Sequence, residues 1–247
     1  MTAVSTGLGR YFAAEADMVL VAATYSSGGP LVIVCHGAGQ TPANYAPLSA
    51  NADLKMLADS GCVVVVADLG GINTWGLDTV VHQTTGRIAS LRTWAAGAPY
   101  FADTTRMALI GDSMGGQNAI LYHRLIPANV KCTVLRCPVV AADALHDRDG
   151  AGMGALMNTA YGSAPNWEAA VPTKDPSHVN QTAVIATFAS KVRAFYSTND
   201  TTVLPADVTS FAAATGISIR PMGAVGHSPT SVHARQQADF IWSKLNA

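Results

Sequence analysis

The feature that most constrains the fold is a series of short apolar runs separated by longer mixed segments. Runs such as PLVIVCHG (30–37) and CVVVVADLG (62–70) are apolar without alternation, which is typical of strands buried on both faces of a sheet. The segments between them carry apolar residues at helical spacing. This alternation of strand and helix predicts a three-layer α/β/α fold with a mostly parallel sheet. The expected strands begin at Asp17, Pro30, Cys62, Arg106, Val130, Val192 and Ile217, and the expected helices cover 42–60, 86–97, 114–126, 205–215 and 229–245.

Two further features of the sequence bear on the expected architecture: the first apolar run and one long segment without strands. The run 17–25 is followed by a Ser-Ser-Gly-Gly turn and then by the second run, so we expect a hairpin that makes the N-terminal strand antiparallel at the sheet edge. The segment 139–190 contains several prolines and no clear strand, and it is too long for an ordinary loop. We expect a small cap-like insertion there, within a single domain that spans 1–247.

The composition excludes several classes of partner. Only 13% of the residues are charged, the net charge is −1 and there is no basic run, so the sequence does not indicate nucleic-acid binding. No segment reaches about 18 uninterrupted apolar residues, which predicts that no transmembrane segment is present. Glu15 and Asp17 interrupt the only apolar stretch near the start, so we expect no signal peptide.

The four cysteines are expected to be buried free thiols. Cys132 and Cys137 lie five positions apart on one expected strand, about 16 Å from each other, which is too far for a disulfide. Cys35 and Cys62 lie at or in apolar runs, and the spacing of the four predicts no zinc site. The stretch 147–150 resembles part of a calcium loop but lacks the other ligands. We therefore expect no metal.

The stretch GDSMGGQ, residues 111–117, joins an expected strand to an expected helix. In that context G-x-S-x-G is typical of a nucleophile elbow, where the serine has positive φ and its neighbours must be small. We predict that Ser113 is the nucleophile and that Gly111 and Gly115 give clearance, with Asp112 outside the catalytic set. The alternative, the GDSGG stretch of trypsin-like proteases, belongs to all-β proteins with an upstream histidine and does not fit this pattern.

A serine hydroxyl is a weak nucleophile and needs a base. His227 follows the last expected strand, in a loop where sites form in open α/β sheets, and we predict that it is this base. A carboxylate should hold its ring. Asp200 ends the run 192–200 and is preferred over Asp143, which follows the preceding strand. The alternative role for Asp200 is to cap a helix or a turn.

The oxyanion of the reaction should be stabilised by backbone N–H groups. The run 30–37 continues into His-Gly-Ala-Gly, residues 36–39, whose glycines allow close approach to a carbonyl group. We predict that the N–H groups of Ala38 and Met114 are the donors, with Gly39 beside the substrate and His36 in a structural role. The alternative is that this stretch is only a turn.

The HGAG loop, the GDSMG elbow, Asp200 and His227, in the order serine, acid, histidine, resemble the α/β-hydrolase superfamily over nearly the whole chain. The resemblance implies acyl transfer to water through an acyl-serine intermediate, with no cofactor. The stretch DLGGINTWGLD (68–78) is similar to small esterase-like members, including some from actinobacteria and their phages. In this stretch Trp75 either lines the substrate pocket or packs in the core. With the free thiols and no signal peptide expected, the protein is expected to be cytoplasmic or phage-associated.

Together these features predict a serine carboxylic-ester hydrolase acting on a small-molecule, lipid or glycan ester. The apolar residues of the insertion suggest an acyl site, with simple cap packing as the alternative; they are Met153, Leu156, Met157, Tyr161 and Trp167. A peptidase, thioesterase or acyltransferase on the same triad is an alternative, because a fold does not choose among these reactions. An envelope- or phage-tail-associated esterase or binding module is a further alternative.

Overall fold

The computed structural model describes residues 2–5, 10–14, 17–46, 49, 51–228 and 233–247, with side chains from residue 17 onward. Within these residues nine strands form one sheet, in the order β1-β2-β3-β5-β4-β6-β7-β8-β9. The strands are β1 (Thr2–Ser5), β2 (Arg10–Ala14), β3 (Asp17–Val21), β4 (Pro30–Cys35), β5 (Val63–Ala67), β6 (Asp103–Asp112), β7 (Val130–Arg136), β8 (Val192–Tyr196) and β9 (Ser218–Pro221). The helices are α1 (Ala52–Asp59), α2 (Asp78–Val81), α3 (Arg87–Ala95), α4 (Met114–Leu125), α5 (Ala142–Arg148), α6 (Met153–Tyr161), α7 (Ala164–Lys174), α8 (Val179–Ala186), α9 (Pro205–Thr215) and α10 (Ala234–Leu245), with 3₁₀ turns η1 (Pro42–Tyr45) and η2 (Ala189–Lys191).

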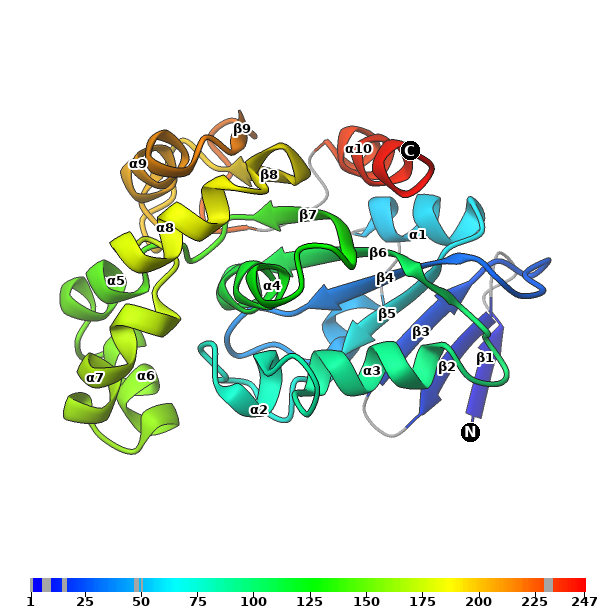
Figure 1. The fold of residues 1–247 in the computed structure, drawn as a ribbon, viewed down its shortest axis with the longest axis horizontal. Helices are drawn as coiled ribbons and strands as arrows, with labels where there is room; N and C mark the ends of the chain where they lie inside the picture. The colour runs from blue at the N-terminus through cyan, green and yellow to red at the C-terminus, as the bar shows by residue number, and fades with distance from the viewer. Residues whose placement is uncertain (1, 6–9, 15–16, 47–48, 50, 229–232) are drawn as a thin grey trace.

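The predicted α/β architecture with a mostly parallel sheet is confirmed. The strands from β4 to β9 run parallel to one another, whereas β1, β2 and β3 at the N-terminal edge pair antiparallel with each other and, through β3, with β5. The antiparallel N-terminal edge is therefore confirmed as well. The carboxyl ends of β4, β6 and β7 point to the left in Figure 1, toward the side on which α5, α6 and α7 lie.

The expected hairpin between the first two apolar runs is wrong. β3 pairs with β5, in a register that joins Met18 to Val66, and β4 lies on the other side of β5. The reason is burial: β4 is buried along its whole length and takes a central position between two parallel strands. That position leaves β3 to pair with the free edge of β5. β1 and β2, which no sequence pattern indicated, extend the sheet beyond β3.

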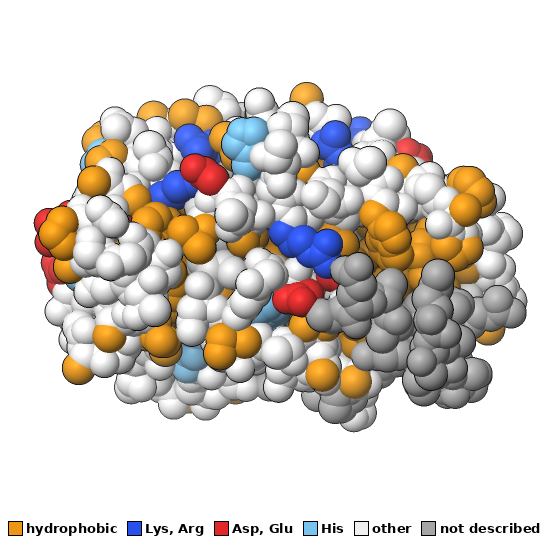
Figure 2. All heavy atoms as spheres, turned by 90° about the horizontal axis from the view of Figure 1, so that it is seen from below, with side chains coloured by type: hydrophobic (Ala, Val, Ile, Leu, Met, Phe, Trp, Pro, Cys, Tyr) orange, Lys and Arg blue, Asp and Glu red, His pale blue; other side chains and the backbone are white. Residues whose placement is uncertain are grey.

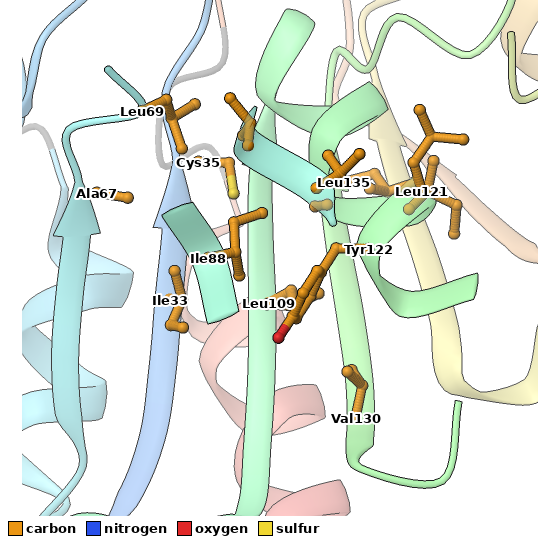
Figure 3. Packing of buried hydrophobic residues seen from close by; sticks show 14 of the residues in the cluster. Ile33, Cys35, Ala67, Leu69, Ile88, Leu109, Leu121, Tyr122, Val130 and Leu135 are labelled. Atoms are coloured by element: carbon orange, nitrogen blue, oxygen red, sulfur yellow. The ribbon is translucent and has the colours of Figure 1, made fainter. Parts of the chain in front are cut away.

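Two apolar layers cover the two faces of the sheet. Successive side chains of a strand point to opposite faces, so both faces must be apolar where helices cover both. Leu31, Ile33 and Cys35 pack in the layer shared with α2, α3 and α4, while Val32 and Val34 pack in the layer shared with α1 and α10. Figure 3 shows part of the first layer. This arrangement explains why the strand runs are continuously apolar.

The expected helices agree with α1, α3, α4, α9 and α10, and η1 forms the start of the segment expected at 42–60. The expected start of the last helix, at 229, lies outside the described residues. The segment 139–190 contains α5 to α8, none of which the sequence patterns indicated individually. No described helix is long and apolar enough to cross a membrane. All four cysteines are free and buried, as expected.

Charged side chains are dispersed over the face seen from below in Figure 2. Basic and acidic side chains lie close to each other there, and hydrophobic side chains lie among polar ones. On the described part of this face, neither sign of charge gathers into one large patch. The mixed pattern agrees with the small net charge of the sequence, −1.

Candidate active site

Ser113 forms the sharp turn between β6 and α4. Its backbone has φ 52° and ψ −118°, the positive-φ conformation that a nucleophile elbow requires. The Ser113 N–H donates to the carbonyl oxygen of Arg136 (3.0 Å), and its own carbonyl accepts from the N–H groups of Gly116 (2.8 Å) and Val139 (3.0 Å). These three bonds hold a conformation that a non-glycine residue rarely adopts.

The glycines of the elbow let β4, β6 and α4 approach one another. A Cβ atom added to Gly115 would lie 2.0 Å from the carbonyl oxygen of Cys35. A Cβ atom added to Gly111 would lie 2.4 Å from the carbonyl oxygen of Gly115. Both distances are far below van der Waals contact, and the obstacle in each case is backbone, so the elbow cannot form in this position with larger residues.

We expect Gly115→Ala to lower the free energy of unfolding by about 1–3 kcal/mol, because an inserted methyl group must push two backbone segments apart. Urea denaturation followed by circular dichroism measures the change. Gly150→Ala is the matched control, since its nearest neighbouring atom would be 3.8 Å from the new Cβ. Equal stability of the two variants would contradict this explanation of the elbow glycine.

The structure brings Ser113, His227 and Asp200 together. His227 Nε2 lies 2.9 Å from Ser113 Oγ, and His227 Nδ1 lies 2.8 Å from Asp200 Oδ2. The three residues follow β6, β9 and β8, so they meet at the carboxyl ends of parallel strands. The rival acid Asp143 lies in α5, where its N–H donates to Asp175 Oδ2 (3.2 Å).

Asp200 is fixed by backbone as well as by the histidine. Its Oδ1 accepts hydrogen bonds from the N–H groups of Thr202 and Val203, both at 2.9 Å, while Oδ2 faces His227. Burial raises the pKa of Asp200, but the hydrogen bond and charge of His227 and the two N–H groups outweigh it, and the pKa lies below its ordinary value. An ionised Asp200 accepts from Nδ1–H and leaves Nε2 free to take a proton. One carboxylate oxygen of Asp200 therefore holds the turn that follows it, and the other contacts the ring of His227.

Two backbone N–H groups beside Ser113 are free to bind an anion. In the described part of the chain, the N–H groups of Ala38 and Met114 donate no hydrogen bond. The N–H of Gly39, in contrast, donates to the carbonyl oxygen of Ile72 (2.9 Å). Met114 is the first residue of α4, whose N-terminus favours negative charge. The two N–H donors predicted from the sequence, those of Ala38 and Met114, are thus available in the described structure. The N–H of the neighbouring Gly39 is already occupied.

The loop after β4 is held rigidly against the elbow. His36 is 1% exposed and its Nδ1 donates to the carbonyl oxygen of Gly37 (2.9 Å). The Gly37 N–H donates to Gln40 Oε1 (3.0 Å), and a Cβ on Gly37 would lie 3.3 Å from the Cβ of Ser113. Burial lowers the pKa of His36, so this histidine stays neutral while it supports the loop.

Solved structures share this fold over nearly the whole chain. An S-formylglutathione hydrolase from Agrobacterium tumefaciens aligns with a TM-score of 0.65 and 16% identity, over 100% of this chain and 98% of its own. FphF, a fluorophosphonate-binding serine hydrolase from Staphylococcus aureus, aligns with a TM-score of 0.67 and 13% identity, over 96% of this chain and 97% of its own. The chain has the α/β-hydrolase fold.

Other solved structures with this fold carry out different reactions. A prolyl endopeptidase aligns with a TM-score of 0.62 and 16% identity, over 99% of this chain and 38% of its own. An esterase from Pyrococcus furiosus is also matched. No protein-family model matches the sequence, and no curated protein matches it either. These similarities therefore identify the fold, and the side chains of the site decide the reaction.

In this α/β-hydrolase fold a buried ion cluster lies next to the elbow. Arg136, the last residue of β7, binds Asp112 through Nε and also through Nη2, which lies 2.6 Å from Asp112 Oδ2. Its Nη1 lies 2.9 Å from Asp53 Oδ2, and Tyr45 Oη donates to Asp112 Oδ2 at 2.5 Å. The partners of Asp112 are not indicated by the motif GDSMG that contains it. The available signal was Arg136 itself, a charged residue ending the apolar run VKCTVLR.

The charges of this cluster depend on one another. Burial alone would lower the pKa of Arg136, but the carboxylates of Asp112 and Asp53 raise it above its ordinary value. For Asp112, burial raises the pKa more than Arg136 and Tyr45 lower it. The positive charge of Arg136 therefore compensates the negative charge of the two buried carboxyl groups beside the elbow, those of Asp112 and Asp53.

We expect Arg136→Met to lower the free energy of unfolding by about 3–5 kcal/mol, because it leaves two buried carboxyl groups without a cation. Arg148→Met is the matched control: Arg148 pairs with Asp207 at 3.1 Å, but its side chain is 31% exposed. Such a pair contributes about 0–1 kcal/mol. Urea denaturation of both variants measures the difference, and similar losses would argue against a structural role for the cluster.

Trp75, which the sequence places either in the substrate pocket or in the core, is completely buried in the core layer with α4. Two hydrogen bonds hold the loop that contains Trp75. The neighbouring Gly76 N–H donates to Asn118 Oδ1 (2.8 Å), and Tyr161 Oη of the insertion donates to the carbonyl oxygen of Trp75 (2.8 Å). This burial favours the packing alternative, and contact with a substrate stays a prediction.

The apolar residues of the insertion divide into two groups. Met157 and Trp167 are fully buried, and the ring of Tyr161 meets Trp167 edge-on with centroids 5.2 Å apart. These contacts favour cap packing for the buried pair. Met153 and Leu156 are only partly buried against the core, so they are the candidates for contact with an acyl chain.

Proposed function

We propose that this protein is a serine hydrolase that cleaves carboxylic esters through an acyl-serine intermediate. One observation carries the proposal: a continuous line of hydrogen bonds from Ser113 Oγ to His227 Nε2 (2.9 Å) and from His227 Nδ1 to Asp200 Oδ2 (2.8 Å). This order of nucleophile, base and orienting acid is what activates a serine hydroxyl. The strained elbow and the free N–H groups beside it support the same reaction.

In the proposed reaction Ser113 Oγ attacks the ester carbonyl carbon while His227 Nε2 takes the hydroxyl proton. Asp200 stabilises the resulting imidazolium through Nδ1–H. The oxyanion of the tetrahedral intermediate lies between the N–H groups of Ala38 and Met114. When the intermediate collapses, His227 gives its proton to the departing alcohol. Water then attacks the acyl-serine with His227 as base, which releases the acid and restores Ser113.

Esters are favoured over peptides as substrates. The S-formylglutathione hydrolase and FphF align over 98% and 97% of their own length, whereas the prolyl endopeptidase shares only 38% of its chain with this protein. A thioester is the second candidate, because the neighbour from Agrobacterium tumefaciens is an S-formylglutathione hydrolase. Both substrates carry an acyl group on a good leaving group, which the same triad can transfer to water.

A panel of substrates with the same butyryl group tests the proposal: a p-nitrophenyl ester, a phenyl thioester and a p-nitroanilide. We expect hydrolysis of the ester and the thioester, and the anilide to be the slowest substrate. Ser113→Ala gives the background, and Ser210→Ala, an exposed serine in α9, is the control that keeps full activity. A purified, folded protein that hydrolyses no ester or thioester would contradict the proposal. Faster hydrolysis of the anilide would identify a peptidase instead.

A further inference from the structure

A thiol lies beside the histidine and the acid of the proposed triad. The Cys137 sulfur, a carboxylate oxygen of Asp200 and a ring nitrogen of His227 all lie within 4.8 Å of one another. Cys137 follows β7, which lies between β6 and β8, the strands that lead to Ser113 and Asp200. The turn is fixed, because the N–H of Cys137, with φ 42°, donates to the carbonyl oxygen of Phe195 (2.8 Å). The sequence pattern alone indicates only that Cys137 is a buried free thiol.

These three groups are ligands that suit zinc. Thiolate, imidazole and carboxylate bind Zn²⁺ at about 2.0–2.3 Å, so the ligand atoms of a tetrahedral site stand roughly 3–4 Å apart. Cys137, Asp200 and His227 need only small side-chain movements to reach that spacing. Three protein ligands leave a fourth position for water. Among the described residues this is the one group of three or more such side chains.

We propose that Cys137, Asp200 and His227 form a binding site for Zn²⁺ or a similar thiophilic divalent cation, and that the bound ion switches the triad off. Nδ1 is the ring nitrogen that faces Asp200, at 2.8 Å, so it is the nitrogen that meets the ion. The Cys137 thiol loses its proton to solvent when the sulfur–metal bond forms. The proton on Nδ1 is displaced, and the neutral ring carries its proton on Nε2.

This change of tautomer removes the base. Nε2, which lies 2.9 Å from Ser113 Oγ, then donates a hydrogen bond to the hydroxyl group and cannot accept its proton. The carboxylate of Asp200 is engaged by the ion and no longer orients the ring. Inhibition rests on the proposed function, because it assumes that His227 is the base, but the binding of the ion does not.

Burial both isolates this site and opposes binding. Cys137 is 1% and Asp200 4% exposed, whereas the side chain of His227 is 24% exposed, so an ion enters from the histidine side. Burial, and then the nearby Asp200, raise the pKa of the Cys137 thiol to about 12. Without the ion, His227 Nδ1 keeps its hydrogen bond to Asp200 Oδ2, at 2.8 Å, and the triad is intact.

Direct binding is the primary test. Zn²⁺ is titrated into the metal-free protein by calorimetry, and Cd²⁺ is titrated while the ultraviolet absorption of a cadmium–thiolate bond is followed. We expect one ion per chain, and a loss of affinity in Cys137→Ala of at least the roughly 10- to 100-fold that removal of an outer-sphere partner costs. Cys132→Ala, at a buried cysteine in β7, the strand that Cys137 follows, is the matched control and keeps the wild-type affinity. If Cys137→Ala does not fold by circular dichroism, Cys137→Ser replaces it.

Ester hydrolysis with and without Zn²⁺ is the second test. We expect saturating Zn²⁺ to abolish hydrolysis by the wild type and by Cys132→Ala, a chelator to restore it, and Cys137→Ala to be insensitive. Absence of binding at micromolar Zn²⁺, equal binding by wild type and Cys137→Ala, or stimulation of hydrolysis by Zn²⁺ would each overturn the proposal. If Cys137-dependent binding occurs but the metal-free protein hydrolyses no substrate, the proposed function fails and the metal site stands.

Discussion

Replacement of Ser113 by alanine is expected to lower kcat/KM for an ester by about 10⁴- to 10⁶-fold, mostly through kcat. The reason is that His227 Nε2, which accepts the hydrogen bond of the Ser113 hydroxyl at 2.9 Å, has no oxygen left to activate, so no acyl-enzyme can form. The free N–H groups of Ala38 and Met114 remain, and they account for any residual rate over uncatalysed hydrolysis. Steady-state kinetics on the butyryl ester measure the change.

The double variant Ser113→Ala/His227→Ala sharpens this prediction. Residues that act as a unit in one step do not lose activity additively, so the double variant should be no slower than Ser113→Ala alone. Ser210→Ala serves as the control for the effect of losing a serine hydroxyl elsewhere. Losses that multiply in the double variant would mean that Ser113 and His227 act independently, against the proposed triad.

Asp200→Asn is expected to lower kcat by about 10⁴-fold while the protein stays folded. The ionised Asp200 accepts from Nδ1–H, whereas an asparagine amide can donate to Nδ1 and hold the ring with its proton on Nε2. That tautomer cannot take the proton of Ser113. The pKa of Asp200 lies below its ordinary value, so the wild-type carboxylate stays charged over the neutral range and its protonation should not change the wild-type rate between about pH 6 and 8.

Asp143→Asn is the matched control for this prediction, because Asp143 was the rival acid in the sequence. It lies in α5 and binds Asp175 through its backbone, so its replacement should change kcat less than about twofold. A larger loss in Asp143→Asn than in Asp200→Asn would reverse the assignment of the acid. Circular dichroism spectra of both variants separate a catalytic loss from unfolding.

The central sheet could be predicted from sequence because its signals are local. A run such as Val63–Ala67 has a continuous apolar pattern wherever helices cover both faces of a strand. The pairing of β3 with β5 could not be predicted, because it depends on which strand takes the centre of the sheet. The turn after β3 looked like a hairpin, but tertiary burial of β4 decided the order.

The elbow and the HGAG loop could also be predicted from residues close together in the sequence, because the backbone conformation there requires glycine at fixed positions. Arg136 and Cys137 could not be assigned to the site, since their partners lie far away in sequence. Asp53 is 83 positions from Arg136, and His227 is 90 positions from Cys137 (227 − 137). Trp75 was ambiguous for a similar reason: a tryptophan in a Gly-rich loop fits a pocket or a core equally well until its burial is known.

The most direct test of the central claim is covalent labelling with a fluorophosphonate followed by peptide mass spectrometry. The reagent reacts with a serine only when a neighbouring base activates it, so it reports the triad without assuming a substrate. We predict one adduct per chain, on Ser113, and its disappearance in Ser113→Ala and His227→Ala. An adduct on another residue, or labelling that persists in Ser113→Ala, would contradict the account.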